Sequence, residues 1–176
     1  MTDTRVLVLV GSLRADSFNR RLAEAVQAQA PAGVVIDIAA GLGDVPFYNE
    51  DLDGADAPAT VVSLRAQVTA ADRVLVVTPE YNGTMPAVLN NALDWASRPF
   101  GEGSIKGKPL AVVGAYGGKW AHDDTRRSAK VAGANVVEDI EISHRYAWGE
   151  DPVSDEATVQ SFVDAVAKLV AYESVA

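Results

Sequence analysis

The hydrophobic positions of the chain fall into uninterrupted apolar runs separated by stretches of mixed character. Runs such as VLVLV at 6–10 contain β-branched residues and leucine without polar alternation. A strand buried on both faces has this pattern, and such strands belong to parallel sheets that helices cover. Asp37 interrupts one run and predicts a strand nearer the sheet edge. Five strands are expected, over residues 6–10, 34–38, 74–77, 110–113 and 136–142, the last a loosely alternating edge strand.

The stretches between these runs carry apolar residues at helical spacing, which predicts amphipathic helices that pack on the sheet. Ser17 is the expected N-cap of the first helix and Ser154 of the last, because a hydroxyl there accepts a hydrogen bond from a free N–H of the first turn. The fourth stretch, residues 119–131, is polar and only weakly amphipathic. Five helices are expected, over residues 18–30, 58–70, 85–96, 119–131 and 154–171.

This alternation predicts an α/β fold with a doubly wound, five-stranded parallel sheet between two layers of helices, a three-layer α/β/α arrangement. A length of 176 residues with 48% hydrophobic content predicts a single domain over residues 1–176. Ligands of such sheets bind outside the carboxyl ends of the strands. The loops after the first, third and fourth strands, at 12–19, 79–83 and 115–118, are therefore expected to converge on one crevice.

The first of these loops carries groups that bind anions. Ser12 and Ser17 offer hydroxyls, Asn19 an amide and Arg14 a guanidinium, directly before a helix whose first N–H groups are free. Together they are typical of a phosphate site. The loop matches neither the GxGxxG dinucleotide fingerprint nor the Walker loop.

Two further arginines in the first helical turn have two possible interpretations. Arg20 and Arg21 fall in the first helical turn, where a cation opposes the helix dipole, and a bound dianion would offset that cost. The alternative is a capped helix with solvated arginines.

Composition excludes several classes of function. The chain has no cysteine, which excludes disulfides, thiolate catalysis and cysteine metal sites. A net charge of −9 with a pI near 4.6 argues against nucleic acid and anionic membranes as partners. With no signal peptide and no run of membrane-spanning length, a cytoplasmic protein is expected.

Two longer motifs identify a family. The chain reads GSLRADSFNR at 11–20 and TPEYNGTMPAVLNNALDW at 78–95, with PFYNEDLDG at 46–54 and IKGKP at 105–109 between and after them. It thereby resembles, over nearly its whole length, the NADPH-dependent FMN reductase family. These are flavodoxin-like flavoenzymes that include quinone, chromate and azo reductases.

The resemblance assigns the three loops to FMN. The first loop would hold the phosphate, the segment after the third strand would line the isoalloxazine ring, and the turn after the fourth would complete the site. The implied cofactor-binding residues are Ser12, Arg14, Ser17, Phe18 and Asn19, then Pro79, Glu80, Tyr81, Asn82 and Gly83, then Ala115, Tyr116, Gly117 and Gly118. Tyr116 is expected to narrow access to the ring.

The implied activity is hydride transfer from NADPH or NADH to bound FMN, followed by two-electron reduction of a quinone, flavin, azo compound or metal oxyanion. Because the flavin ring accepts the hydride, no acid–base catalytic residue and no metal are expected. The family also implies a homodimer or homotetramer acting on a small-molecule acceptor. Two alternatives remain: a flavodoxin-like electron carrier without pyridine-nucleotide activity, and a binding domain that has lost flavin.

Several other side chains carry weaker expectations. Glu80 is expected near the flavin in a structural role, with a solvated loop carboxylate as the alternative. His122, Asp123 and Asp124 are consecutive, so a solvated helix face is expected rather than a metal site. Trp95 and Trp148 are expected to pack or to lie at an interface, and the helix face with Asn91, Asp94 and Trp95 is a candidate subunit contact.

Overall fold

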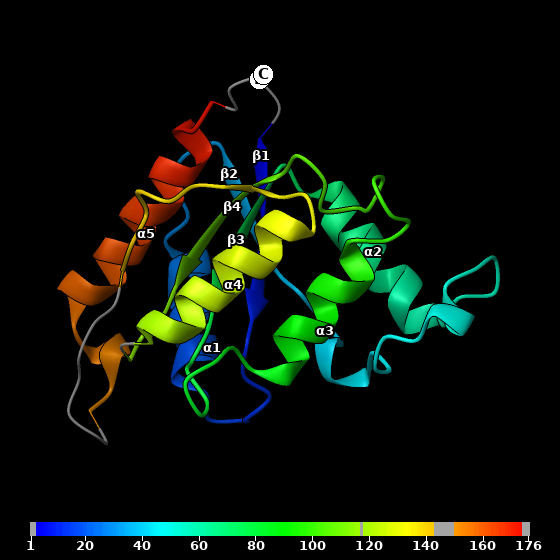
Figure 1. Ribbon diagram of the computed structural model, residues 1–176. Coiled ribbons are helices and arrows are strands. Elements are labelled where there is room, and N and C mark those ends of the chain that lie inside the picture. Colours follow the sequence, from blue (N-terminus) through cyan, green and yellow to red (C-terminus); the bar gives the residue numbers. More distant parts are fainter. Residues whose placement is uncertain (1–2, 117, 143–149, 174–176) are drawn as a thin grey trace.

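The computed structural model describes residues 3–116, 118–142 and 150–173 (Figure 1). Strands and helices alternate along the chain, as the apolar runs predict. The strands are β1 (Thr4–Val10), β2 (Val34–Ile38), β3 (Arg73–Val77), β4 (Pro109–Val113) and β5 (Asn135–Val136). The helices are α1 (Phe18–Ala28), α2 (Ala59–Ala70), α3 (Ala87–Ala96), α4 (Lys119–Val131) and α5 (Glu156–Ala171).

All strand pairs are parallel, and the strand order is β2-β1-β3-β4-β5, which confirms the predicted flavodoxin-like sheet. β2, the strand with Asp37, lies at an edge as expected. The prediction of a strand over 136–142 is wrong in length, because β5 ends at Val136. The chain turns at 138–139 and buries Val137 and Ile140, so the alternation reflects a turn rather than an extended strand.

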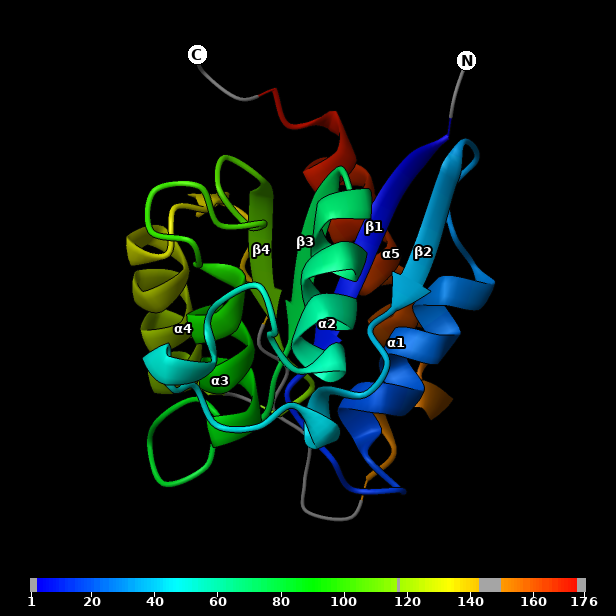
Figure 2. The same cartoon turned by 90° about the vertical axis from the view of Figure 1, so that its right-hand side faces the viewer.

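Helices cover both faces of the sheet. α1 and α5 pack on one face, and α2, α3 and α4 pack on the other, as Figure 2 shows with α2 in front of the sheet and α5 behind it. Two hydrophobic clusters fill the spaces between the layers. Leu7 and Leu9 of β1 point to one cluster, while Val6 and Val8 point to the other. Both faces of the central strands are therefore buried, which explains their lack of polar alternation.

The Ser17 N-cap is confirmed, and the Ser154 N-cap is wrong. Ser17 Oγ accepts a hydrogen bond from the Arg20 N–H at 3.3 Å. Ser154 instead ends a short 3-10 helix, η3 (Pro152–Ser154), and the following Asp155 caps α5 by accepting from the Ala157 N–H at 3.2 Å. Because η3 occupies Pro152–Ser154, with Asp151 as its N-cap, α5 begins two residues later than expected, at Glu156.

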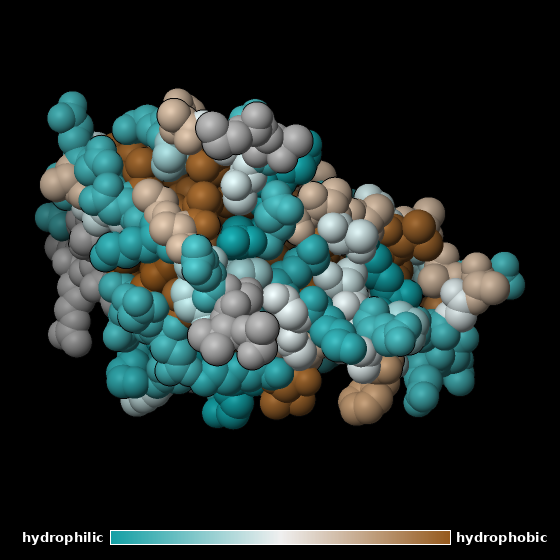
Figure 3. All heavy atoms as spheres, turned by 90° about the horizontal axis from the view of Figure 1, so that it is seen from above, coloured by the Kyte–Doolittle hydropathy of each residue, from teal (hydrophilic) through white to brown (hydrophobic). Residues whose placement is uncertain are grey.

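The parallel arrangement places the loops after β1, β3 and β4 at one edge of the sheet, the lower edge in Figures 1 and 2. Figure 3 looks onto the opposite edge, where hydrophilic side chains surround separate apolar patches. In the ranges described, no helix combines the length and the apolar character needed to cross a bilayer.

Candidate functional site

A cavity of about 340 Å³ lies at the carboxyl edge of the sheet. Residues from all three loops line it, so the structure brings together residues far apart in the sequence, such as Ser12 and Tyr81, which are 69 positions apart. Nine of the predicted residues form its lining: Ser12, Arg14, Ser17, Phe18, Asn19, Pro79, Glu80, Tyr81 and Tyr116. Gly117 lies outside the described residues.

The amino end of α1 supplies the positive side of this cavity. Ser17 satisfies the Arg20 N–H, and the earlier N–H groups of the first turn have no acceptor within the helix. Arg14 lines the cavity, is exposed, and makes no ion pair with any residue the structure describes. A guanidinium beside free helix N–H groups can bind a phosphate.

The neighbouring arginines have acidic partners within the protein. Arg21 pairs with Asp151 at 2.5 Å and lies over the Phe18 ring, while Arg20 approaches Glu24 at 3.8 Å. Neither lines the cavity. Carboxylates therefore offset the unfavourable position of these cations in the helix dipole, and of the three arginines Arg14 remains for a ligand.

Asn19 joins the first loop to the turn after β4. It is buried, and its Oδ1 accepts a hydrogen bond from the Ala115 N–H at 3.1 Å. Ala115 itself has no exposed surface, so it contributes to the site through its backbone position. Gly11 permits a similar close approach on the other side of the loop, because a β-carbon built there would lie 2.6 Å from Thr78 Oγ1.

The segment after β3 forms a tight hairpin beside the cavity. Tyr81 and Thr84 exchange backbone hydrogen bonds, and the central residues Asn82 and Gly83 have φ of +52° and +75°. Positive φ at both positions is the type I′ geometry that an Asn-Gly pair favours. Asn82 and Gly83 therefore form the tip of the hairpin and do not line the cavity. Gly83 packs instead against Trp120, since a β-carbon built there would lie 3.2 Å from Trp120 Cε3.

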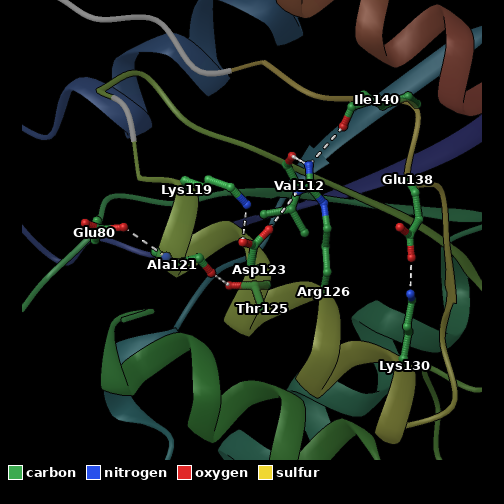
Figure 4. Close-up of polar contacts among 10 residues, drawn as sticks. All are labelled: Glu80, Val112, Lys119, Ala121, Asp123, Thr125, Arg126, Lys130, Glu138 and Ile140. Carbon is green, nitrogen blue, oxygen red and sulfur yellow. Dashed lines mark hydrogen bonds and ion pairs between the residues drawn. The ribbon is translucent and has the colours of Figure 1, made fainter. Parts of the chain in front are cut away.

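Glu80 links the cavity to α4. Its Oε2 accepts a hydrogen bond from the Ala121 N–H at 3.0 Å, in the first turn of α4 (Figure 4). The N-cap position of that helix is Gly118, with φ of +101° and no side chain to accept such a bond. Glu80 thus supplies the missing cap while it lines the cavity, which favours the predicted structural role over a solvated carboxylate.

Aromatic side chains form the remaining wall. The Tyr81 hydroxyl lies 3.5 Å from Ser12 Oγ and bridges the first and second loops. The Tyr116 ring contacts the Phe18 ring edge-on at a centroid distance of 5.3 Å, and its hydroxyl donates to the Glu150 carbonyl. With Pro79, these rings give the cavity a flat apolar portion next to its cationic end.

This combination fits a flavin mononucleotide. Its phosphate needs cationic and hydrogen-bonding donors, which Arg14, Ser12 and the start of α1 offer. Its ring needs a flat apolar wall beside backbone turns, which Pro79, Tyr81 and Tyr116 offer.

Two sequence expectations outside the cavity are wrong. Asn91 and Trp95 are buried within their own chain and cannot form a subunit contact, whereas the packing role expected for Trp95 is confirmed. Trp95 Nε1 donates to the Pro46 carbonyl at 2.8 Å, and Asn91 Oδ1 accepts from the Tyr48 N–H at 2.8 Å. They therefore fix the long 41–54 loop to α3. Trp148 lies outside the described residues.

His122 is the second correction. It has no exposed surface, although its neighbours Asp123 and Asp124 lie at the helix surface. The segment KWAHDDTRRSAKV gives no sign of this, because its only large apolar residues, Trp120 and Val131, stand near its two ends and leave the buried face of the helix undefined. His122 does not line the cavity, and neither of its ring nitrogens has a hydrogen-bond partner among the described residues. Sequence reasoning missed its burial.

Comparison with known proteins gives a consistent result. The family model described as NADPH-dependent FMN reductase matches residues 4–149. A 2-hydroxy-1,4-benzoquinone reductase from a Burkholderia species is 47% identical over 110 residues, which cover 62% of this chain and 59% of that protein. A quinone reductase from Pseudomonas putida is 44% identical over 127 residues, which cover 70% and 68%.

A solved structure extends the likeness over both chains. The flavoenzyme NAD(P)H:(acceptor) oxidoreductase FerB from Paracoccus denitrificans superposes with a TM-score of 0.82 at 36% identity. The alignment covers 96% of this chain and 97% of that one.

Proposed function

Because this chain belongs to the NADPH-dependent FMN reductase family, we propose that it binds FMN at the carboxyl edge of its sheet and reduces a small-molecule acceptor with electrons from NADPH or NADH. The observation that carries this proposal is the composition of the cavity. One end offers Arg14, which has no acidic partner among the described residues, beside a helix amino terminus, and the other offers a wall of prolyl and tyrosyl rings.

In this proposal the phosphate binds to Ser12, Arg14 and Ser17 and to the free N–H groups that open α1. Asn19 and Ala115 hold the first loop and the turn after β4 in register. Asn82, Gly83 and Gly118 act through the shape of their turns, which fixes the positions of Tyr81 and of α4. Phe18 and Tyr116 enclose the cofactor from one side.

When bound, FMN supplies the chemistry, since its ring accepts a hydride and returns two electrons. The chain supplies position and electrostatics. Its part is to hold the ring beside fixed backbone groups and leave one face open to substrates. Among the described lining residues the carboxylate is that of Glu80, which accepts a hydrogen bond from the first turn of α4, so the proposed mechanism assigns no residue to proton transfer.

A quinone is the proposed acceptor class. The two relatives reported above are named for quinone reduction, and both are more than 40% identical over the matched segment. Free flavins, azo compounds and metal oxyanions are further candidates, because an exposed, reduced flavin ring can donate electrons to many kinds of acceptor.

We also propose that the whole chain forms one FMN-binding domain, located in the cytoplasm, and that it assembles as a homodimer or homotetramer. Large apolar side chains on the surface support assembly. Phe47 is 79% exposed, Phe100 87% and Val131 84%, and each would lose water-exposed area in an interface.

The proposal is tested by steady-state oxidation of NADPH in the presence of 1,4-benzoquinone. FMN-reconstituted protein should consume NADPH at a rate proportional to enzyme, and protein stripped of FMN should not. Free FMN at the same concentration is the control for cofactor-only chemistry. A reconstituted protein no faster than this control would overturn the proposal.

A further inference from the structure

His122 packs against Gly114 and Gly118, which flank the turn after β4. Its backbone N–H donates to the Gly118 carbonyl at 2.8 Å and so closes the first turn of α4. A β-carbon built on Gly114 would lie 2.6 Å from His122 Nε2, and one built on Gly118 would lie 3.7 Å from it. The imidazole therefore occupies the space between α4 and the end of β4, directly behind the proposed flavin site.

Burial of an imidazole without hydrogen bonds is energetically unfavourable. His122 has no exposed surface, and neither ring nitrogen has a hydrogen-bond partner in the described part of the chain. An unsatisfied buried polar group destabilises the folded state, and such groups in native proteins call for an explanation. A leucine or methionine would fill the same space without that cost.

Burial, together with one neighbouring cation, favours the neutral imidazole. Arg126, one turn further along α4, is nearly buried and donates to the Val112 and Ile140 carbonyls (Figure 4). Burial, followed by the proximity of Arg126, lowers the pKa of His122 below its ordinary value. Glu141, Asp123 and Glu80 act in the opposite direction but do not cancel the shift.

A proton on His122 would thus place two cations one helical turn apart in a buried space. The first turn of α4 would have to move to hydrate the new charge. That turn is attached to the cavity through the hydrogen bond between Ala121 and Glu80. It also supports the hairpin after β3, through the contact of Trp120 with Gly83 and the hydrogen bond from Thr84 to Asp124 at 2.5 Å.

We propose that His122 is a positioning residue that makes flavin binding sensitive to acid: the neutral imidazole holds α4 and the adjoining turns in the binding geometry, and its protonation releases them. This inference rests on the proposed function, because FMN is the ligand whose affinity reports the geometry. By linkage, if FMN binds only the neutral form well, bound FMN must in turn oppose protonation of His122.

The test is the FMN dissociation constant, measured by quenching of flavin fluorescence from about pH 8 to about pH 5, the range in which histidine titrates. Wild type is compared with His122→Gln, which keeps a neutral hydrogen-bonding side chain that cannot titrate. His144→Gln, which removes the other histidine of the chain, is the matched control. The phosphate of FMN itself titrates near pH 6, but it does so equally for all three proteins.

Wild type and His144→Gln should lose affinity toward low pH about fivefold more than His122→Gln does. Equal pH profiles for wild type and His122→Gln, with binding intact at high pH, would overturn the inference while leaving the proposed function standing. Lack of FMN binding at high pH in wild type would reject the proposed function itself, and this inference with it.

A second measurement does not depend on whether the variant folds. With two histidines in the chain, the His122 titration is readily followed by NMR in wild-type protein with and without FMN. FMN should shift the midpoint of that titration to lower pH. An unchanged midpoint would overturn the inference, because a positioning role through the neutral form requires the shift.

Discussion

Arg14, Arg20 and Arg21 are close in sequence but differ in their partners. Arg20 and Arg21 face Glu24 and Asp151, while Arg14 lines the cavity without a carboxylate beside it in the described structure. Charge composition alone cannot make this distinction, since Asp151 is 130 positions from Arg21. Arg14 can be identified as the arginine available to a ligand only from the folded structure, in which Arg20 and Arg21 have acidic partners.

Arg14→Ala should therefore weaken FMN binding, whereas Arg20→Ala should not. Charge-assisted hydrogen bonds to phosphate are worth about 1.5–3 kcal/mol, which corresponds to about 10–150-fold in affinity. Fluorescence titration with FMN measures this loss, and titration with riboflavin, which lacks the phosphate, should show little difference between the proteins. An Arg14→Ala variant that binds FMN as tightly as wild type would contradict the phosphate assignment.

At Gly83, the backbone conformation and the close packing both disfavour a side chain. Gly83→Ala should lower the free energy of unfolding by about 1–2 kcal/mol, because a side chain at positive φ is strained and would press on Trp120. Gly54→Ala is the matched control, since a β-carbon there meets no atom within 4 Å and its φ is not positive. Urea denaturation compares the two, and equal midpoints would argue against the hairpin geometry described here.

Among the elements, α4 shows how a helix can begin without a capping side chain of its own. Its N-cap is a glycine, and Glu80 accepts from its first turn across the cavity edge. The start of this helix therefore depends on the loop after β3, which joins the two walls of the site.

Removing that cap should destabilise the first turn of α4. Glu80→Ala should cost about 1 kcal/mol, and Glu80→Gln, which keeps an acceptor oxygen, should cost less. Hydrogen exchange of the first α4 amides should increase in the alanine variant more than in the glutamine variant. If both variants exchanged like wild type, Glu80 would not act as the cap.

The elements also show which parts of the fold can be predicted from sequence. β2 and α4 fall on their predicted ranges, and β1, β3 and β4 begin one or two residues earlier than expected. Such buried strands are well predicted because both of their faces are apolar. β5 and the start of α5 were mispredicted because a turn that buries Val137 and Ile140 imitates strand alternation, and because Asp155 competes with Ser154 as a cap.

At the scale of the whole molecule, the carboxyl edge could be located from sequence, but its internal contacts could not. The apolar runs fix the strand directions and hence which loops meet. The hydrogen bond between Asn19 and Ala115 joins residues 96 positions apart, and no local pattern predicts it. The burial of His122 and Trp95 likewise depends on which neighbour each helix packs against.

The stability of the whole fold should decrease in acid, partly through His122. Its pKa is lowered from 6.5 in the folded protein, so below that pH the unfolded chain binds more protons than the native state. The stabilisation is present above the unfolded-state pKa and is lost as the pH falls through the folded-state pKa. His122→Gln should flatten this part of the profile in urea denaturation series, and an unaltered profile would contradict the buried neutral imidazole.

The measurement that tests the central claim most directly is an anaerobic visible spectrum of the FMN-reconstituted protein before and after addition of NADPH, and separately of NADH. The account predicts that the oxidised flavin bands disappear within seconds with at least one nucleotide and return when a quinone is added. An oxidised spectrum unchanged by either nucleotide would contradict the reductase assignment and would indicate an electron carrier instead.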